Sequence, residues 1–281
     1  MEPPSWLPPT FHSLAYRDYF LLFIGQISNS LALWMDMVAR PVLVVALTGS
    51  AVQLGLISLV RGVPMMFLGP IGGLVSDRFD RRVVMLVSKS LSMGVNTVFA
   101  AIIVSGNLEL WHIYATAILR SLLMAFDGPA RQALLPSLIP ERLLLNGIAL
   151  NTGSMQIVRI LSASVAGFLI AFWAFAFGYG DDDARSFGGV YLVTAGAYVV
   201  AVFVTYMIRV PMHGRVERTQ DTWLVGLTQG FRFAGKSPVI LGLLVLFAVQ
   251  SLFGMPYLQV FVPWLALKTM DIGAEGAGIL L

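Results

Sequence analysis

Long runs of apolar residues alternate with short polar segments along the whole chain. Six runs are long enough to cross a bilayer as helices, because about 20 residues at 1.5 Å rise cover ~30 Å. They lie at about 20–47, 51–75, 83–105, 109–128, 144–175 and 189–208. A seventh run covers about 238–265, with breaks at Gly254 and Pro256, and an eighth begins at Gly273. The pattern predicts a bundle of membrane helices and the beginning of another.

The polar segments between these runs predict where the chain turns and how it is divided. Thr48-Gly49-Ser50 predicts a tight turn, and Asp127-Gly128-Pro129 predicts the end of the fourth helix. Residues 209–237 form the longest hydrophilic stretch. We therefore expect three parts, which are an N-terminal six-helix transmembrane bundle at 1–208, a cytoplasmic linker at 209–237 and the start of a C-terminal bundle at 238–281.

Composition supports an all-α polytopic membrane protein. Hydrophobic residues make up 57% of the chain and charged residues 12%, against about 25% charged residues in a soluble domain. Cysteine is absent, which excludes disulfides and thiolate metal sites. The three histidines lie far apart, so no metal site is expected, and Asp181-Asp182-Asp183 resembles a solvated loop more than a calcium site. The N-terminus lacks a positively charged region, which argues against a cleaved signal peptide.

The distribution of basic residues predicts the orientation in the membrane. Twelve basic residues fall on the side of the N-terminus, and two, Arg185 and Lys268, fall on the other. The twelve are Arg17, Arg78, Arg81, Arg82, Lys89, Arg131, Arg142, Arg209, Arg215, Arg218, Arg232 and Lys236. Because Lys and Arg accumulate in cytoplasmic loops, the N-terminus should be cytoplasmic.

The turn between the second and third runs carries the most distinctive motif. Gly73 is followed by Asp77, Arg78, Arg81 and Arg82. The glycines at the end of the second run allow close helix packing, and the arginines hold the turn at the cytoplasmic side. Asp77 is unusual, because a carboxylate at the C-terminal end of a helix opposes the helix dipole. We expect Asp77 to pair with Arg131 or with the end of a helix in the second bundle.

This spacing resembles the signature that joins the second and third helices in the major facilitator superfamily. The superfamily usually has glycine where this chain has Asp80. Gly25-Gln26 in the first run and the segment from Pro129 to Pro136 resemble the branch that exports drugs and siderophores such as macrolides and enterobactin. In the fifth run, relatives often carry Gly-Pro where this chain has Ser162-Ala163. That departure removes an expected kink and with it support for a strict drug/proton antiporter motif.

The resemblance implies a secondary transporter with two six-helix bundles that works by alternating access. It implies export of a small organic molecule such as a drug, a siderophore or an anionic amphipathic metabolite, with protons as the coupling ion. We expect a multi-pass, monomeric protein of a bacterial plasma (inner) membrane. The expected partners are the substrate, protons and the lipid bilayer, with no nucleic acid, no cofactor and no enzymatic activity. The alternative is a seven-span receptor or retinal-type protein.

Five charged residues fall inside the predicted spans rather than in the loops. Asp36 and Arg40 lie in the first span, and Arg61, Arg120 and Arg159 lie in the second, fourth and fifth. All but Arg40 lie ~15–22 Å from a surface at 1.5 Å per residue. A charge at that depth costs about 2.5–3.5 kcal/mol and should face the bundle interior or water.

Two interpretations of these five charges remain open. Asp36 either pairs with Arg61 as a purely structural bridge, with Arg40 as a partner on its own helix face, or shares a cavity with Arg61, Arg120 and Arg159. In the second case the cavity has an excess of positive charge and favours anionic cargo. Arg120 is the strongest candidate for binding, because it matches the arginine of the superfamily's fourth-helix motif.

Overall fold

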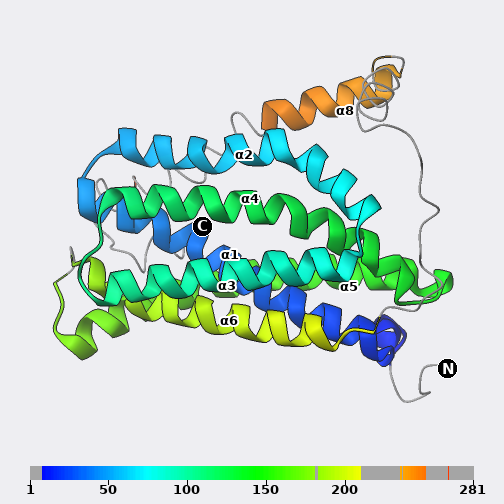
Figure 1. The fold of residues 1–281 in the computed structure, drawn as a ribbon, viewed down its shortest axis with the longest axis horizontal. Helices are drawn as coiled ribbons and strands as arrows, with labels where there is room; N and C mark the ends of the chain where they lie inside the picture. Colours follow the sequence, from blue (N-terminus) through cyan, green and yellow to red (C-terminus); the bar gives the residue numbers. More distant parts are fainter. Residues whose placement is uncertain (1–7, 181–182, 210–234, 236, 251–264, 266–281) are drawn as a thin grey trace.

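The computed structural model describes residues 8–180, 183–209, 235, 237–250 and 265. Six long helices lie alongside one another in one bundle (Figure 1). They are α1 Arg17–Thr48, α2 Ala51–Arg78, α3 Arg81–Val104, α4 Leu110–Leu134, α5 Leu144–Phe177 and α6 Gly188–Met207. Short 3-10 helices lie between or before them, at η1 Pro9–Ala15, η2 Leu135–Ser137, η3 Glu141–Leu143 and η4 Ala184–Phe187. The predicted all-α, six-helix bundle is confirmed, and the helix ends agree within three residues except at the end of α4.

The predicted end of the fourth helix at Asp127-Gly128-Pro129 is wrong. α4 continues through Pro129 to Leu134, and the next segment contains the 3-10 turn η2. A proline inside a helix removes one backbone hydrogen bond and adds a local clash. Packing against the neighbouring helices compensates here, and Nη1 of Arg81 donates to the carbonyl of Ala133 at 2.7 Å. That bond satisfies a carbonyl in the last turn of α4, which has no partner within the helix.

The helices differ in how deeply they are packed. α1 lies against α5 and α6, α6 against α3, and α4 between α3 and α2. In the most apolar stretch of α1, 61% of the residues are buried, whereas in that of α2 the share is 12%. Five helical segments of the described chain are long and apolar enough to cross a membrane. They are Arg17–Thr48, Ala51–Gly69, Arg81–Val104, Glu141–Phe177 and Ala184–Met207. α4 is not among these five segments, and it carries the charged residues Arg120, Asp127 and Arg131.

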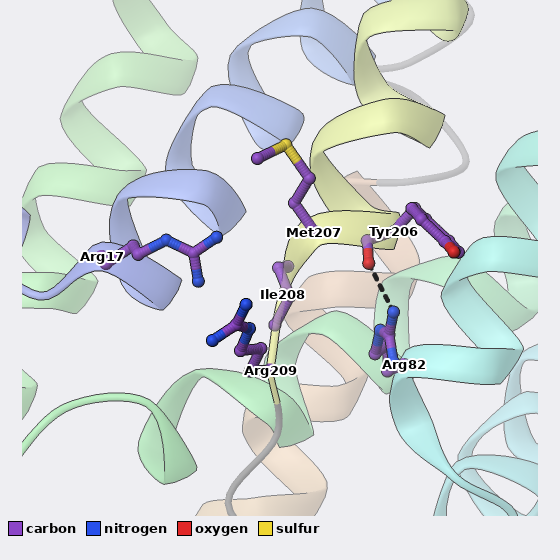
Figure 2. Close-up of a pocket in the computed structure, with 6 residues that line it drawn as sticks. All are labelled: Arg17, Arg82, Tyr206, Met207, Ile208 and Arg209. Atoms are coloured by element: carbon purple, nitrogen blue, oxygen red, sulfur yellow. Dashed lines mark hydrogen bonds between the residues drawn. The ribbon is translucent and has the colours of Figure 1, made fainter.

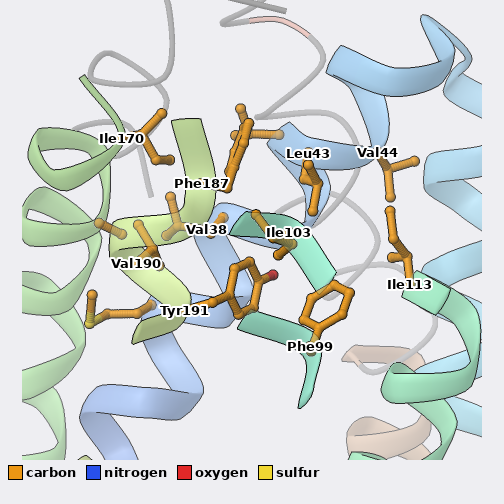
Figure 3. Close-up of a cluster of buried hydrophobic side chains, with 14 of the residues drawn as sticks. Val38, Leu43, Val44, Phe99, Ile103, Ile113, Ile170, Phe187, Val190 and Tyr191 are labelled. Carbon is orange, nitrogen blue, oxygen red and sulfur yellow. The ribbon is translucent and has the colours of Figure 1, made fainter. Parts of the chain in front are cut away.

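Two apolar clusters hold the ends of the bundle together. The larger cluster includes Leu43 of α1, Phe99 of α3, Ile113 of α4, Ile170 of α5 and Tyr191 of α6, all buried (Figure 3). The smaller one lies at the other end and joins the first turns of α1 and α3 to the last turns of α4 and α6. Polar and charged side chains are buried between the two clusters.

A glycine just before the α2–α3 turn allows two helices to approach closely. A Cβ atom on Gly72 would overlap the backbone carbonyl of Ala125 in α4, because the two helix backbones are in contact there. A Cβ on Gly73 would meet no atom of the described chain within 4 Å. Gly72 therefore fixes the spacing of α2 and α4, and the family-signature glycine Gly73 does not.

Residues 251–264 of the seventh predicted span, including Gly254 and Pro256, lie outside the described residues. Its first part forms α8, Pro238–Val249. Large apolar side chains of α8 are exposed, among them Val239 at 72% and Leu246 at 66%. The described part of α8 is therefore not packed into the core of the six-helix bundle.

The two glycines give a matched test of helix spacing. Gly72→Ala should lower the stability of the detergent-purified protein by about 1–3 kcal/mol, because the added methyl group overpacks the α2–α4 contact. Gly73→Ala, one position further on, should be neutral or slightly stabilising, because alanine favours a helix and meets no neighbour. Thermal unfolding of the two variants measures the difference. Equal stability would show that the α2–α4 distance is not set at Gly72.

Candidate functional site

Asp36 of α1 is the centre of a charge cluster buried in the bundle. Its carboxylate lies 2.8 Å from Nη2 of Arg40, 3.0 Å from Nη1 of Arg120 and 3.7 Å from Nη2 of Arg61. The hydroxyl of Tyr191 in α6 donates to it at 3.1 Å. Asp36 lies 12 residues before the end of α1, about 18 Å along the helix. We call Asp36, Arg40, Arg61 and Arg120 the Asp36 cluster.

Arg40 is the most completely bound member of the Asp36 cluster. Its Nε and Nη2 donate to Asp36, and its Nη1 donates to the carbonyl of Ile113 and to the hydroxyl of Thr116, both at 2.9 Å. The guanidinium also lies over the ring of Phe99 at 4.9 Å. Arg40 is only 1% exposed. It therefore connects α1 to α3 and α4, and each of its three guanidinium nitrogens already has a partner in the protein.

Arg120 and Arg61 are bound less completely than Arg40. Nη2 of Arg120 donates to the hydroxyl of Tyr198 at 3.0 Å. Nη1 of Arg120 lies close to Asp36, yet it makes no well-aligned hydrogen bond within the described chain. Arg61 has a single contact with the carboxylate, at 3.7 Å, and its side chain is 20% exposed. These two guanidinium groups are the members that can still donate to a ligand.

Arg159 lies apart from the Asp36 cluster. Its guanidinium lies over the ring of Trp34 at 5.6 Å, and no described ion pair joins it to Asp36. Trp34 and Asp36 are two residues apart on α1, so they point to nearly opposite sides of that helix. The structure thus brings together Asp36, Arg40, Arg61 and Arg120 and leaves Arg159 on another side of α1.

A second group of buried charges lies closer to the α2–α3 turn. Asp127 of α4 is 3.9 Å from Nζ of Lys89 in α3 and 4.0 Å from Nε of Arg131. Lys89 is 1% exposed and donates to the hydroxyl of Thr205 at 3.1 Å. Oδ1 of Asp127 and Nε of Arg131 make no hydrogen bond within the described residues. We call Lys89, Asp127 and Arg131 the Asp127 cluster.

The Asp127 cluster was missed by sequence reasoning, which placed Lys89 at the membrane surface and Asp127 in a helix break. Lys89 is eight residues into α3, or about 12 Å from its start. This depth already indicates from the sequence that Lys89 lies inside the bundle and not at the membrane surface. Tyr191 and Tyr198 were also missed, because a tyrosine in an apolar helix gives no sign of its partner. Asp127 lies seven residues after Arg120 on α4, so the two clusters are about 10 Å apart.

The α2–α3 turn (residues 73–82) joins three helix ends. Asp80 caps α3, since its side chain accepts hydrogen bonds from the amides of Arg82 and Val83 at 2.9 and 3.3 Å. Arg81 donates to the C-terminal end of α4, as described above. Arg82 donates to the carbonyls of Thr205 and Tyr206 at the end of α6. Cations at helix C-termini are stabilised by the helix dipole.

The first half of the same turn is only partly exposed, and Ser76 within it is buried. Asp77 and Arg78 are exposed, and Gly73 is half-buried with no close neighbour. Arg131 pairs with Asp127 on its own helix, so the described contacts do not join it to Asp77. The pairing of Asp77 with a helix end of a second bundle stays a prediction.

The loop between α5 and α6 contains a partly exposed ion pair between Asp183 and Arg185. Hydrogen bonds from Arg185 lower the pKa of Asp183 from its usual value, with Nη2 2.8 Å from Oδ2. Asp183 also caps η4 through the amide of Arg185. Asp181, Asp182 and His213 lie outside the described residues. Within the described chain, no group of three His, Asp or Glu residues could hold a metal ion.

Five of the six long helices are apolar enough to cross a membrane, and the bundle encloses two groups of buried charges, an arrangement that suits a membrane transport protein. A family model described as "Transmembrane secretion effector" matches residues 9–281. The chain therefore belongs to this family of the major facilitator superfamily.

Curated relatives of the chain include transporters and exporters. An uncharacterised transporter of the superfamily from Bacillus subtilis is 28% identical over 83% of this chain and 54% of its own length. Macrolide efflux protein A of Streptococcus pyogenes is 24% identical, covering 76% of this chain and 49% of the relative. An enterobactin exporter of Salmonella choleraesuis is 24% identical, covering 88% and 56%. The chain spans about half the length of these relatives.

Solved structures of other transporters share the fold. A bacterial homologue of the human lysosomal transporter Spinster superposes with a TM-score of 0.67 at 17% identity, covering 97% of this chain and 58% of that one. The nucleoside transporter NupG gives a TM-score of 0.61 at 13% identity, covering 93% and 63%. The alternative of a seven-span receptor or retinal-type protein finds no support in these matches.

The two arginines that contact Asp36 from α1 and α2 should differ sharply in their effect on stability. Arg40→Gln leaves a buried carboxylate short of its best-bound partner and should cost about 3–5 kcal/mol. Arg61→Gln removes one long contact of a partly exposed side chain and should cost about 1 kcal/mol or less. Thermal unfolding and the yield of monodisperse protein measure both. Similar losses from the two variants would contradict the structural role assigned to Arg40.

Proposed function

We propose that the chain forms the cargo-binding part of a secondary active transporter that exports a small organic molecule by alternating access, with transport coupled to protons. The cargo would be a drug, a siderophore or an anionic amphipathic metabolite. The proposal rests on one observation. Three guanidinium groups surround the single carboxylate of Asp36 inside the bundle. The names of the efflux relatives support the direction of transport.

The charge balance of the Asp36 cluster favours an anionic group on the cargo. Three cations and one anion leave an excess of positive charge in a medium where an unpaired charge is costly. Arg40 is fully bound, so the excess falls on Arg120 and Arg61. An anionic group of the cargo would compete with Asp36 for these two guanidinium groups.

The same competition gives a route to proton coupling. When cargo takes over Arg120 and Arg61, Asp36 loses two of its three cationic partners, and its charged form loses their stabilisation. In this scheme Asp36 takes up a proton as cargo binds and releases it after the cargo leaves. Asp127 is a second buried carboxylate with loose ion pairs, and it is the alternative carrier to be tested.

The α2–α3 turn is proposed as the gate between the two halves of the transporter. Arg81 and Arg82 hold α3 to the ends of α4 and α6, which makes the turn rigid on its own side. Gly73, Asp77 and Arg78 remain at the surface, where a helix end of a second bundle can meet them. Asp77 would then stabilise the state that is closed to the cytoplasm.

The proposed setting is the plasma membrane of a bacterium, with a monomeric protein and a cytoplasmic N-terminus. Arg78, Arg81 and Arg82 lie at the same end of the bundle as Arg17 and the exposed Arg142, which supports that orientation. The division into a bundle at 1–208, a linker at 209–237 and a second bundle from 238 is part of the same proposal.

Arg120→Gln should weaken the binding of an anionic cargo by about tenfold or more, because a hydrogen bond between charged groups is lost. The binding of a neutral cargo of similar size should change much less. Fluorescent dyes of each kind, titrated against the protein encoded by the complete gene, measure the ratio. Arg159→Gln is the control, because it removes the same charge outside the Asp36 cluster. An equal loss from both variants would remove the Asp36 cluster as the cargo site.

Asp36→Asn should abolish efflux driven by a pH gradient in proteoliposomes while cargo binding stays measurable. Asparagine keeps the shape of the side chain but cannot exchange a proton. Asp127→Asn is the matched variant in the second cluster and should retain pH-driven efflux. The reverse result would place the coupling at Asp127, and normal efflux by both variants would leave Asp36 with a structural role only.

A further inference from the structure

A pocket lies at the end of the bundle where α1 and α3 begin and α6 ends (Figure 2). Its volume is about 320 Å³. The lining residues come from three separate parts of the chain, and they are Arg17, Arg82, Tyr206, Met207, Ile208 and Arg209. Figure 2 shows the guanidinium groups of Arg17 and Arg209 turned toward the same space, with Arg82 held on the end of α6. Half of the lining residues are thus arginines.

The positive charge around this pocket is only partly neutralised. Asp18 lies 3.4 Å from Nη1 of Arg17, and its carboxylate also accepts a hydrogen bond from the backbone amide of Arg209 at 3.0 Å. Arg82 donates to two backbone carbonyls, which carry no full charge. Among the described residues, no carboxylate forms an ion pair with the side chain of Arg82 or Arg209. One carboxylate therefore faces three guanidinium groups, which favours an anionic ligand.

The exposed aromatic surface beside the arginines favours an anion that also has an apolar part. Tyr206 is 64% exposed, and the guanidinium of Arg82 lies 5.7 Å from the centre of its ring. One turn earlier on α6, Phe203 is 61% exposed. Exposed aromatic residues at the end of a membrane helix are typical of the headgroup level. A ligand here would meet basic groups at one end and a lipid-facing helix surface at the other.

We propose that this pocket binds the phosphate group of an anionic phospholipid, with the acyl chains along the exposed face of α6. Basic pockets between membrane helices are suited to phosphate headgroups, and Arg binds phosphate through several donors in one plane. Under the orientation proposed above, the lipid belongs to the cytoplasmic leaflet. It would connect the first turns of α1 and α3 to the end of α6, beside an arginine of the α2–α3 turn.

The test compares the double variant Arg17→Gln/Arg209→Gln with the unchanged protein. Arg142→Gln is the matched control, because Arg142 is an exposed arginine in η3 at the same end of the bundle. Delipidated protein in detergent is titrated with dioleoylphosphatidylglycerol, dioleoylphosphatidylcholine or inorganic phosphate. Bound lipid is counted by native mass spectrometry, and the unfolding midpoint without lipid checks that each variant is folded.

Phosphatidylglycerol should bind the unchanged protein and the Arg142→Gln variant tighter than phosphatidylcholine does. The double variant should bind it more weakly by about fivefold for each arginine removed, because each basic residue near the headgroups adds a similar increment. Equal binding of the two lipids, or an equal loss in the Arg142→Gln variant, would overturn the proposal. Displacement of the lipid by inorganic phosphate at the same concentration would assign the pocket to a soluble anion instead. None of these results depends on transport, so they are independent of the proposed function.

Discussion

The buried ion pair between Asp36 and Arg40 is the interaction on which the arrangement of the bundle depends. A lone charge at this depth would be expelled from the membrane interior, so each residue requires the other. Because Arg40 also binds Ile113 and Thr116 and lies over Phe99, satisfying Asp36 fixes α1 against α3 and α4. The packing of the large apolar cluster around this point follows from the same requirement.

The need to satisfy buried charges gives the arginines of the membrane interior two different roles, one structural and one in binding a ligand. All three guanidinium nitrogens of Arg40 have partners inside the protein, whereas Nη1 of Arg120 makes no hydrogen bond within the described residues and Arg61 has one long contact with Asp36. A transporter needs both kinds, since a site that binds cargo must be held rigidly by groups that the cargo does not displace. The Asp127 cluster is looser, with ion-pair distances of 3.9 and 4.0 Å, and so differs physically from the Asp36 pair.

The α2–α3 turn shows how one short motif adds polar contacts between helix ends that the smaller apolar cluster also holds together. Arg81 and Arg82 place two adjacent cations on the carbonyl ends of α4 and α6, while Asp80 caps the helix that carries them. The departure of Asp80 from the family glycine is explained by this cap, because aspartate satisfies amides at a helix start. Asp77 and Arg78 are exposed, and the gate proposal assigns both to contact with a second bundle.

The sequence by itself determined the class of the protein, the six helices and most of their ends, because helix length in a bilayer is set by thickness and apolar runs are unambiguous. It also singled out Asp36, Arg61 and Arg120 by depth. Tertiary structure decided which charges meet. Depth places a residue along a helix, but the side of the helix depends on packing, and so Arg159 lies away from Asp36. Packing also lets α4 continue through Pro129, where local sequence rules predict a break. As a result, Asp127 is buried next to Lys89.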